Sequence, residues 1–287
     1  MIITGRHISK LSGYAPALPT PFDEEGNVDA PAFEQLCDLQ LANGATALVV
    51  CGTTGEAPTL SPAEHRELIR IAVAQARGRI PVIAGAGANA TAHAIELTRD
   101  AEATGADAAL SVVPYYNKPT QSGLYAHFRA IAQSTGLPII LYDVPSRTAC
   151  GLPDETVARL AELPRIFGLK DAAGDVSRPA RLRPLVGTKF RLLCGDDGLA
   201  GAGWRRLYFG DLKRCPRPLP QHVLGLETWT IRSCSAPRPP CRRADCGALP
   251  RDQSCSGKAC PSAARPYVAN RPFAIGRLKR SSSGGTE

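Results

Sequence analysis

The stretch Ile166–Asp171 reads Ile-Phe-Gly-Leu-Lys-Asp and places a lysine at the carboxyl end of a short apolar run. Such a run is typical of a buried strand. Two other apolar runs also end in polar groups: Pro138–Arg147 contains Tyr-Asp-Val-Pro-Ser-Arg, and Thr46–Glu56 ends in Gly-Thr-Thr-Gly-Glu. Strands that deliver polar residues at their carboxyl ends are typical of the TIM (β/α)₈ barrel, which holds its active site at that face. The sequence therefore predicts an α/β barrel enzyme with Lys170 as its candidate nucleophile.

The first 200 residues repeat one strand-and-helix unit, which predicts a parallel sheet. Asp29 is a candidate helix cap, and Ser61 with Glu64 has the spacing of a capping box. Seven strands are expected, so the eighth strand and the C-terminal helices of a barrel are expected to be lost. The expected strands are Ala15–Thr20, Thr46–Cys51, Pro81–Ala86, Ala108–Val113, Pro138–Tyr142, Ile166–Lys170 and Phe190–Cys194. The expected helices are Pro31–Leu41, Pro62–Ala76, Thr91–Ala103, Ser122–Ser134, Asp154–Leu163 and Arg178–Val186.

The net charge of +8 combines two unlike parts of the chain. Residues 1–200 contain 18 Lys and Arg against 21 Asp and Glu, whereas residues 201–287 contain 16 against 5. The second part also holds six of the ten cysteines and ten of the 25 prolines, without helical or strand periodicity. We therefore expect a catalytic region over 1–200 and a basic, disordered tail over 201–287.

Composition and motifs exclude several classes of protein. No apolar run approaches the ~20 residues that cross a bilayer, and no opening segment is typical of a secretion signal. A cytoplasmic protein without a membrane partner is expected, with reduced cysteines. Asp196 and Asp197 are adjacent and have no His or Cys at ligand spacing, so no metal site is predicted. The five histidines form no cluster with a nucleophile, which disfavours a Ser/His hydrolase.

Five motifs in order identify a family that the chain resembles. They are Gly52–Glu56 (Gly-Thr-Thr-Gly-Glu), Pro114–Pro119 (Pro-Tyr-Tyr-Asn-Lys-Pro), Tyr142–Thr148 (Tyr-Asp-Val-Pro-Ser-Arg-Thr), Gly168–Asp171 (Gly-Leu-Lys-Asp) and Gly195–Asp197 (Gly-Asp-Asp). Together they resemble the 4-hydroxy-tetrahydrodipicolinate synthase (dihydrodipicolinate synthase) family over about residues 8–200. The resemblance implies a class I aldolase-type condensation of pyruvate with L-aspartate 4-semialdehyde, without a cofactor, in lysine and diaminopimelate biosynthesis. It also implies a homo-oligomer, a dimer of dimers.

The same resemblance implies a role for each motif residue. Lys170 would form the Schiff base, and Tyr142 would pass protons to and from it. Thr54 and Tyr116 would form the proton relay, with Tyr116 supplied by a neighbouring subunit. Thr53 and Thr54 would bind the pyruvate end of the substrates, where hydroxyl and amide donors suit a carboxylate. The family pattern also places Gly195 at the substrate, and Arg147 would bind the carboxylate of the semialdehyde with its planar fork.

Other interpretations remain open for these residues. A strand-end lysine is often an exposed charge, Gly-Thr-Thr-Gly is a common turn, and Arg147 on its own could be a surface charge. Within the superfamily, an N-acetylneuraminate lyase or a keto-deoxy sugar acid aldolase shares the lysine and tyrosine. Thr53, Thr54 and Arg147 favour the synthase.

Residues 201–287 depart from the family pattern in a way that indicates a changed reading frame. Codons permitted for Arg206–Pro216, read one base later, give Gly-Cys-Ile-Ser-Val-Thr-Ser-Asn-Val-Ala, which is typical of the family's eighth strand. The same shift gives family-like sequence at 253–260 and 265–276. We infer a frameshift near Gly198–Trp204, so no nucleic-acid partner is expected, and nucleic-acid binding by the basic tail is the runner-up from a different class of function. A third interpretation is an inactive frameshifted product.

Overall fold

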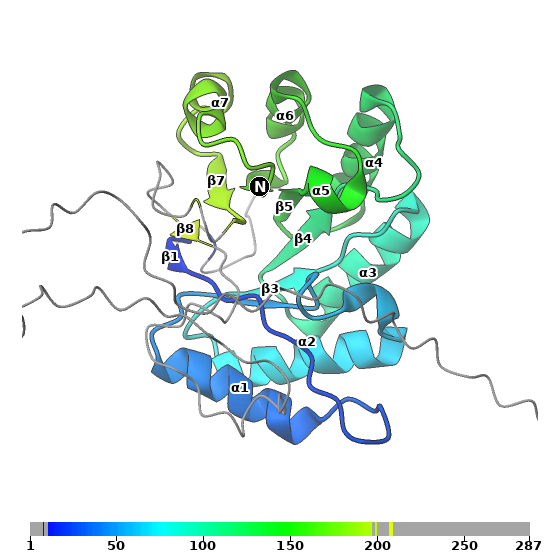
Figure 1. Ribbon diagram of the computed structural model, residues 1–287, viewed down its shortest axis with the longest axis vertical. Helices are drawn as coiled ribbons and strands as arrows, with labels where there is room; N and C mark the ends of the chain where they lie inside the picture. The colour runs from blue at the N-terminus through cyan, green and yellow to red at the C-terminus, as the bar shows by residue number, and fades with distance from the viewer. Residues whose placement is uncertain (1–7, 9–10, 197–198, 200–206, 209–287) are drawn as a thin grey trace, which may run out of the picture. The chain divides into compact units, whose positions relative to one another are not determined.

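The computed structural model describes residue 8, residues 11–196, residue 199 and residues 207–208 (Figure 1). The chain divides into two units, Met1–Arg232 and Ser233–Glu287, and all described residues belong to the first. The expectation of a disordered tail over 201–287 therefore lies almost wholly outside the described residues.

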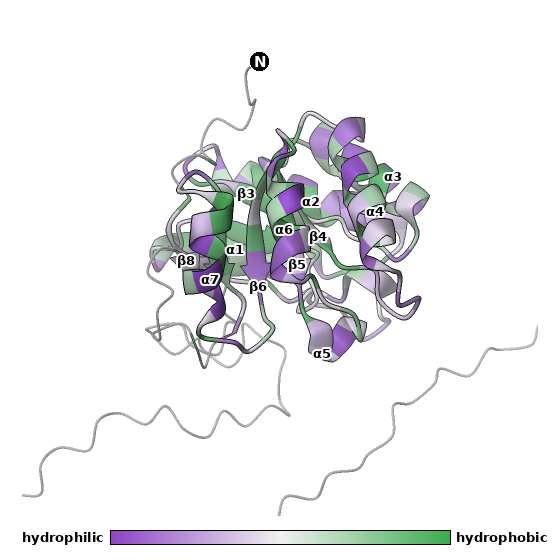
Figure 2. Ribbon diagram, turned by 90° about the horizontal axis from the view of Figure 1, so that it is seen from above, coloured by the Kyte–Doolittle hydropathy of each residue, from purple (hydrophilic) through white to green (hydrophobic). Residues whose placement is uncertain are grey.

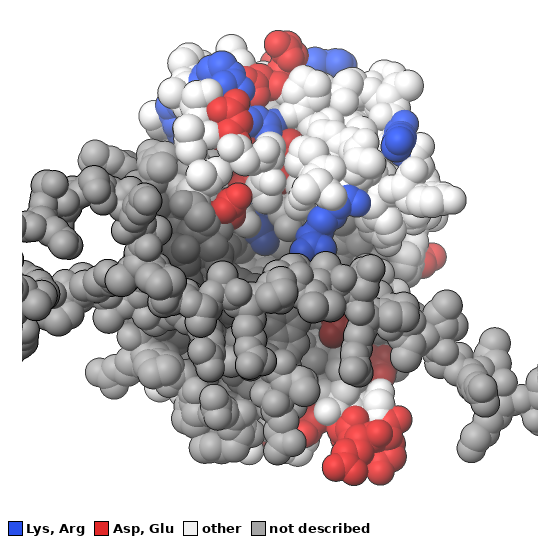
Figure 3. Space-filling view, in the orientation of Figure 1, with Lys and Arg blue, Asp and Glu red and all other residues white. Residues whose placement is uncertain are grey.

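Figure 3 shows acidic atoms gathered over the loop that precedes the first helix.

The described strands form one parallel sheet, as predicted. In sequence order they are β1 (Gly13–Tyr14), β2 (Leu48–Val50), β3 (Val82–Gly85), β4 (Ala108–Val112), β5 (Ile139–Asp143), β6 (Ile166–Asp171), β7 (Arg191–Cys194) and β8 (Leu207–Tyr208). The sheet order is β1-β8-β7-β6-β5-β4-β3-β2. Seven of these strands lie at or next to the predicted runs. The first strand differs from its predicted run, Ala15–Thr20, because β1 ends at Tyr14, just before that run. Within the run, Ala17 makes an isolated parallel bridge with Val49 of β2.

That bridge joins the two ends of the sheet. Val49 N donates to Pro16 O at 3.0 Å, and Leu18 N donates to Val49 O at 2.9 Å. Because β1 and β2 are the outermost strands in the sheet order, this contact closes the sheet on itself. The predicted barrel class is confirmed.

The eighth strand is reduced to two residues rather than missing. β8 pairs with β1 at Gly13↔Leu207 and Tyr14↔Tyr208. Among the described residues, its pairing with β7 is Cys194↔Tyr208. Strands favour aromatic residues such as Tyr208, and the count of seven strands overlooked this pair. The C-terminal helices that were expected to be lost fall among residues outside the described ranges.

Helices surround the strands and lie where the 3.6-residue periodicity predicted them (Figures 1 and 2). The cap at Asp29 is confirmed, since its side chain accepts a 2.9 Å bond from Ala32 N. The Ser61–Glu64 capping box is also present in full. Two short elements were not predicted, namely α5 and the 3₁₀ helix η2. The helical segments are α1 (Ala30–Ala42), η2 (Ala57–Thr59), α2 (Pro62–Ala76), α3 (Thr91–Thr104), α4 (Gln121–Ser134), α5 (Pro145–Thr148), α6 (Asp154–Ala161) and α7 (Arg178–Val186).

Alternation along the strands divides the apolar core into two clusters. On β5, Ile140 and Tyr142 belong to the smaller cluster, together with Val49 and Ile83 of other strands. Ile139 and Leu141 belong to the larger cluster, which includes apolar residues of the helices. Side chains of a strand point alternately to opposite faces, so the smaller cluster fills the barrel and the larger one joins sheet to helices. Tyr142 therefore points into the barrel. No helix in the described part of the chain combines the length and apolarity that a membrane span requires.

A buried histidine predicts how stability depends on pH. His127 of α4 lies 2.9 Å through Nδ1 from Thr91 Oγ1 of α3, and burial lowers its pKa to about 4. An unfolded histidine has a pKa of about 6.5. Between these values the unfolded chain binds more protons than the folded one, so the stability present above pH ~6.5 is lost as the pH falls toward 4.

Between pH 7 and pH 4, the His127→Asn variant should lose up to ~3 kcal/mol less of its free energy of unfolding than the parent loses. Urea unfolding at several pH values measures it. His93→Asn is the control, because the His93 side chain is half exposed. An unchanged pH slope in His127→Asn would contradict the assignment.

Candidate active site

The carboxyl ends of β5 and β6 bring the predicted tyrosine and lysine together. Tyr142 and Lys170 are paired across the two strands. Lys170 is only 7% exposed, and its Nζ lies 4.2 Å from the centre of the Tyr142 ring. An amine and a phenol in contact inside a protein can exchange protons with a reactant bound between them. This pair is the chemical centre of the candidate site.

The surroundings of Tyr142 shift the pKa of its phenol in both directions. Burial raises its pKa, while a hydrogen bond with the Thr53 side chain and the positive charge of Arg147 lower it. Thr53 follows β2 and Arg147 belongs to α5, so two separate segments of the chain act on one hydroxyl group. Thr53, Arg147 and Lys170 therefore all act on Tyr142, although the sequence had assigned Thr53 and Arg147 to the substrate carboxylates.

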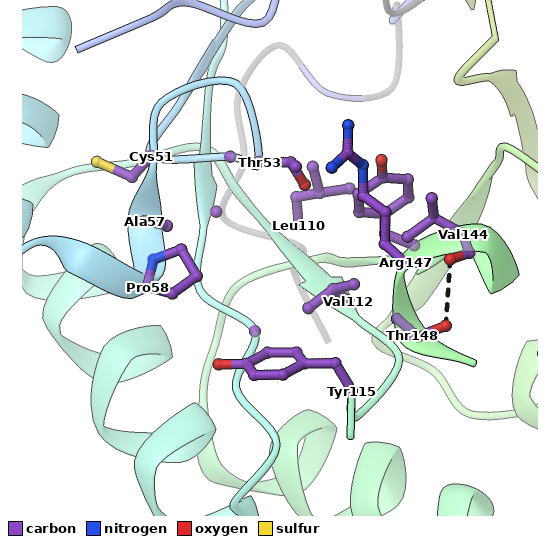
Figure 4. Close-up of a pocket in the computed structure, with 14 residues that line it drawn as sticks. Cys51, Thr53, Ala57, Pro58, Leu110, Val112, Tyr115, Val144, Arg147 and Thr148 are labelled. Atoms are coloured by element: carbon purple, nitrogen blue, oxygen red, sulfur yellow. Dashed lines mark hydrogen bonds between the residues drawn. The ribbon is translucent and has the colours of Figure 1, made fainter. Parts of the chain in front are cut away.

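A cavity of about 280 Å³ adjoins this centre. Figure 4 shows Thr53 and Arg147 facing one another at one end of it and Tyr115 at the other. Much of its wall is apolar, with few polar groups, which is typical of a small-molecule site. Its lining residues are Cys51, Gly52, Thr53, Ala57, Pro58, Gly85, Gly87, Leu110, Val112, Tyr115, Tyr142, Val144, Arg147 and Thr148. Lys170 is not among these residues, but its Nζ contacts the ring of Tyr142, which does line the cavity.

Close backbone approach shapes the cavity wall at Gly85. A Cβ added there would lie 2.0 Å from the carbonyl oxygen of Cys51. Only glycine permits that approach. The Gly85 carbonyl in turn lies 2.7 Å from Nε2 of the buried His65. The β2 and β3 ends are therefore held together where Thr53 begins its loop.

Gly195 follows β7 and lies directly against the lysine. A Cβ at this position would be 2.9 Å from Lys170 Cε, 3.2 Å from Ala172 Cβ and 3.2 Å from Asp171 O. Gly195 N also donates to Asp171 O at 2.7 Å. Its place beside the lysine agrees with a position at the substrate, although its role as a substrate-binding residue stays a prediction.

Replacing Gly195 with alanine should displace the Lys170 amine. A displacement of about 1 Å in a reacting group can cost ~10²-fold in rate, so we expect slower formation of any Lys170 imine by about that factor. Borohydride trapping with a keto acid, quantified by peptide mass spectrometry, measures it. Gly123→Ala is the matched control, because its added Cβ would meet only ordinary contacts at 3.4 and 3.7 Å. Equal trapping rates in the two variants would refute the steric argument.

Two predicted relay residues are not brought into the cavity. Thr54 is half-buried and does not line it. Tyr116 is 88% exposed and adopts a left-handed φ of 71°. Within one chain the relay is therefore not assembled, whereas the neighbouring Tyr115 does line the cavity.

An ionic network behind the site was missed by sequence reasoning. Asp143 and Asp171, the residues after Tyr142 and Lys170, both lie within 3.1 Å of Nη1 of Arg178. One sequence signal could have predicted this network: two neighbouring strands each end in a site residue followed by aspartate. Two buried carboxylates side by side require a cation between them, so the pattern predicts a buried Arg or Lys. Among the described residues, no group of three or more His, Cys, Asp or Glu side chains could hold a metal ion.

Comparisons with known proteins cover the part of the chain that carries this site. The profile of the dihydrodipicolinate synthetase family matches residues 10–206. The 4-hydroxy-tetrahydrodipicolinate synthase of Dechloromonas aromatica is 51% identical over 202 residues, which are 70% of this chain and 69% of that protein. The corresponding protein of Ralstonia nicotianae is 48% identical over 195 residues, 68% of this chain and 66% of that one. The chain thus spans about two thirds of the length of these relatives.

Solved structures give the same result. Dihydrodipicolinate synthase from Aquifex aeolicus superposes with a TM-score of 0.68 at 44% identity and covers 70% of both chains. The chloride-inhibited enzyme from Acinetobacter baumannii, complexed with pyruvate, superposes with a TM-score of 0.68 at 46% identity, again over 70% of both chains.

Proposed function

Because the chain belongs to the dihydrodipicolinate synthetase family, we propose that its barrel carries the site of a 4-hydroxy-tetrahydrodipicolinate synthase. This enzyme is a lyase that condenses pyruvate with L-aspartate 4-semialdehyde in lysine and diaminopimelate biosynthesis. The observation that carries the proposal is the buried Lys170 amine 4.2 Å from the Tyr142 ring, at the carboxyl ends of adjacent barrel strands.

The first half of the reaction is imine chemistry at Lys170. Its neutral amine attacks the keto carbon of pyruvate, a C–N bond forms, and the keto oxygen leaves as water. Tyr142 supplies and removes the protons that this exchange requires, supported by the hydrogen bond with Thr53. Loss of a proton from the methyl carbon then gives an enamine.

The second half makes the carbon–carbon bond. The enamine carbon attacks the aldehyde carbon of the semialdehyde, whose oxygen becomes the 4-hydroxyl group. The amine of the semialdehyde then attacks the imine carbon and displaces Lys170, which closes the ring and frees the enzyme. Arg147 at the cavity rim binds the carboxylate of the incoming semialdehyde through charge-assisted bonds, and Thr53 with the adjacent backbone binds that of pyruvate.

The remaining relay comes from a second copy of the chain. Tyr116 is 88% exposed in the single chain and therefore available to a neighbour's site. Thr54 links the phenol of Tyr142 to that of the neighbour's tyrosine. We accordingly propose a homo-oligomer, assembled as a dimer of dimers, in the cytoplasm.

The variant Arg147→Ala tests whether aspartate 4-semialdehyde is the second substrate. Loss of a charge-assisted carboxylate contact costs a few kcal/mol, or ~10²-fold in rate. In the chain restored to the family reading frame, Arg147→Ala should therefore lower condensation with aspartate 4-semialdehyde about 10²-fold and leave pyruvate trapping at Lys170 intact. A coupled assay of ring formation measures the first effect and mass spectrometry the second. Arg66→Ala is the control, since Arg66 pairs with Asp100 on the exposed surface.

The alternative within the superfamily gives a different result. An N-acetylneuraminate lyase or keto-deoxy sugar acid aldolase would cleave its sugar acid at least as fast as the barrel condenses the semialdehyde. Cleavage of that kind, with no ring formation, would overturn the synthase assignment.

We also propose that residues 201–287 are translated out of frame. The family match ends at Arg206, next to the Gly198–Trp204 segment where the composition changes, which supports this proposal. Resequencing the gene over codons 195–210 is expected to reveal one base more than the family reading frame contains. An inactive product remains the alternative for the 287-residue chain.

A further inference from the structure

Two buried carboxylates lie on the opposite face of β5 and β6 from Tyr142 and Lys170. Asp143 and Asp171 are paired across β5 and β6, one position beyond the pair Tyr142 and Lys170. Asp143 is 1% exposed and Asp171 is 3% exposed. Side chains alternate along a strand, so both acids point away from the barrel interior. Burial raises the pKa of each, and two like charges in this position repel one another unless a cation lies between them.

Arg178 is that cation. It opens α7, and its side chain is 6% exposed. Nη1 lies 2.7 Å from Asp143 Oδ2 and 3.1 Å from Asp171 Oδ2. Nε lies 3.1 Å from Asp154 Oδ1 at the start of α6, and Nη2 donates to the carbonyl of Leu152. One planar guanidinium therefore joins both strand ends to the elements that follow them.

Backbone groups also hold these strand ends. Ala172 N donates to Asp143 O at 2.8 Å, and Gly195 N, after β7, donates to Asp171 O at 2.7 Å. The guanidinium adds to these bonds a side-chain link between the two acids themselves. Tyr142 and Lys170 are covalently next to the two acids, so any separation of Asp143 from Asp171 is transmitted to them.

We propose that Arg178 is a positioning residue: by binding Asp143 and Asp171 together, it fixes the Lys170 amine against the Tyr142 phenol. The expected effect of Arg178 on kcat rests on the proposed function. Its expected effect on the position of the Lys170 amine does not depend on any substrate.

The test compares Arg178→Met with Arg181→Met in the full chain restored to the family reading frame, which is the parent for this comparison. Arg181 lies on the same helix and also binds Asp154, at 2.9 Å, but its side chain is 49% exposed. No contact of Arg181 with Asp143 or Asp171 is found among the described residues. Both variants lose one positive charge from α7 and one contact with Asp154. Arg178→Met also removes the link between the strand ends and the bond to the Leu152 carbonyl, whereas Arg181→Met removes the surface pair with Asp175. Acetic anhydride labelling of Lys170 relative to the exposed Lys118, followed over pH, reports the amine without requiring turnover.

We expect Arg178→Met to change the relative labelling of Lys170 at least ~3-fold and to lower kcat about 10²-fold, with KM for pyruvate nearly unchanged. Arg181→Met should match the parent in all three. Should Arg178→Met fail to fold, Arg178→Lys against Arg181→Lys repeats the comparison with the charge retained. A lower melting temperature with unchanged labelling and unchanged kcat would overturn the proposal. Absence of a pyruvate adduct in the parent would overturn the proposed function instead, and the labelling would still decide the role of Arg178.

Discussion

In the chain restored to the family reading frame, Lys170→Arg is expected to abolish the pyruvate adduct and to lower condensation at least ~10³-fold, because arginine keeps the charge but supplies no amine that can form the imine. Loss of a covalent nucleophile removes the whole reaction path rather than one contact within it. The frame-restored parent, treated with pyruvate and borohydride, should carry one reduced adduct on the peptide that contains Lys170. The described burial of this lysine beside Tyr142 is the reason for the expected selectivity.

Lys118→Arg and Lys189→Arg are the matched controls, since both lysines are exposed. They should label and turn over as the parent does. An adduct on another lysine, or labelling that persists in Lys170→Arg, would refute the assignment of the nucleophile.

Restoring the reading frame is expected to have the second large effect. β8 meets β7 at one residue pair, whereas β6 and β7 share four pairs. A barrel holds its reactive groups only if strand pairing continues around the sheet, and Gly195, which touches Lys170, directly follows β7. Deleting one base between codons 198 and 204 should lengthen this pairing, raise the melting temperature and raise condensing activity from undetectable to that of a working enzyme.

Expression of both versions side by side measures this effect by thermal unfolding, size-exclusion chromatography and turnover. The restored chain with Lys170→Arg is the control, because it should gain the stability without the activity. A monodisperse, active protein from the 287-residue sequence would contradict the frameshift and require the tail to be interpreted as a domain.

The strands and helices up to Cys194 were predictable from sequence because their signals are local. α2 begins and ends as predicted, and β5 and β6 differ from prediction by one or two residues. A parallel sheet then brings the carboxyl ends of neighbouring strands together, so Tyr142 and Lys170 could be expected to meet. The short elements η2 and α5 were missed because three or four residues carry no periodicity.

Sequence by itself therefore determined the barrel class, the family and the meeting of Tyr142 with Lys170. Only the tertiary structure decided which distant groups stabilise them. Arg178 reaches Asp143 across 35 positions of the chain, and Gly85 approaches the Cys51 carbonyl closely enough to exclude any side chain. Such contacts depend on strand register and on how α7 packs against the sheet, which are set by the three-dimensional packing of the core and leave no repeating pattern in the sequence.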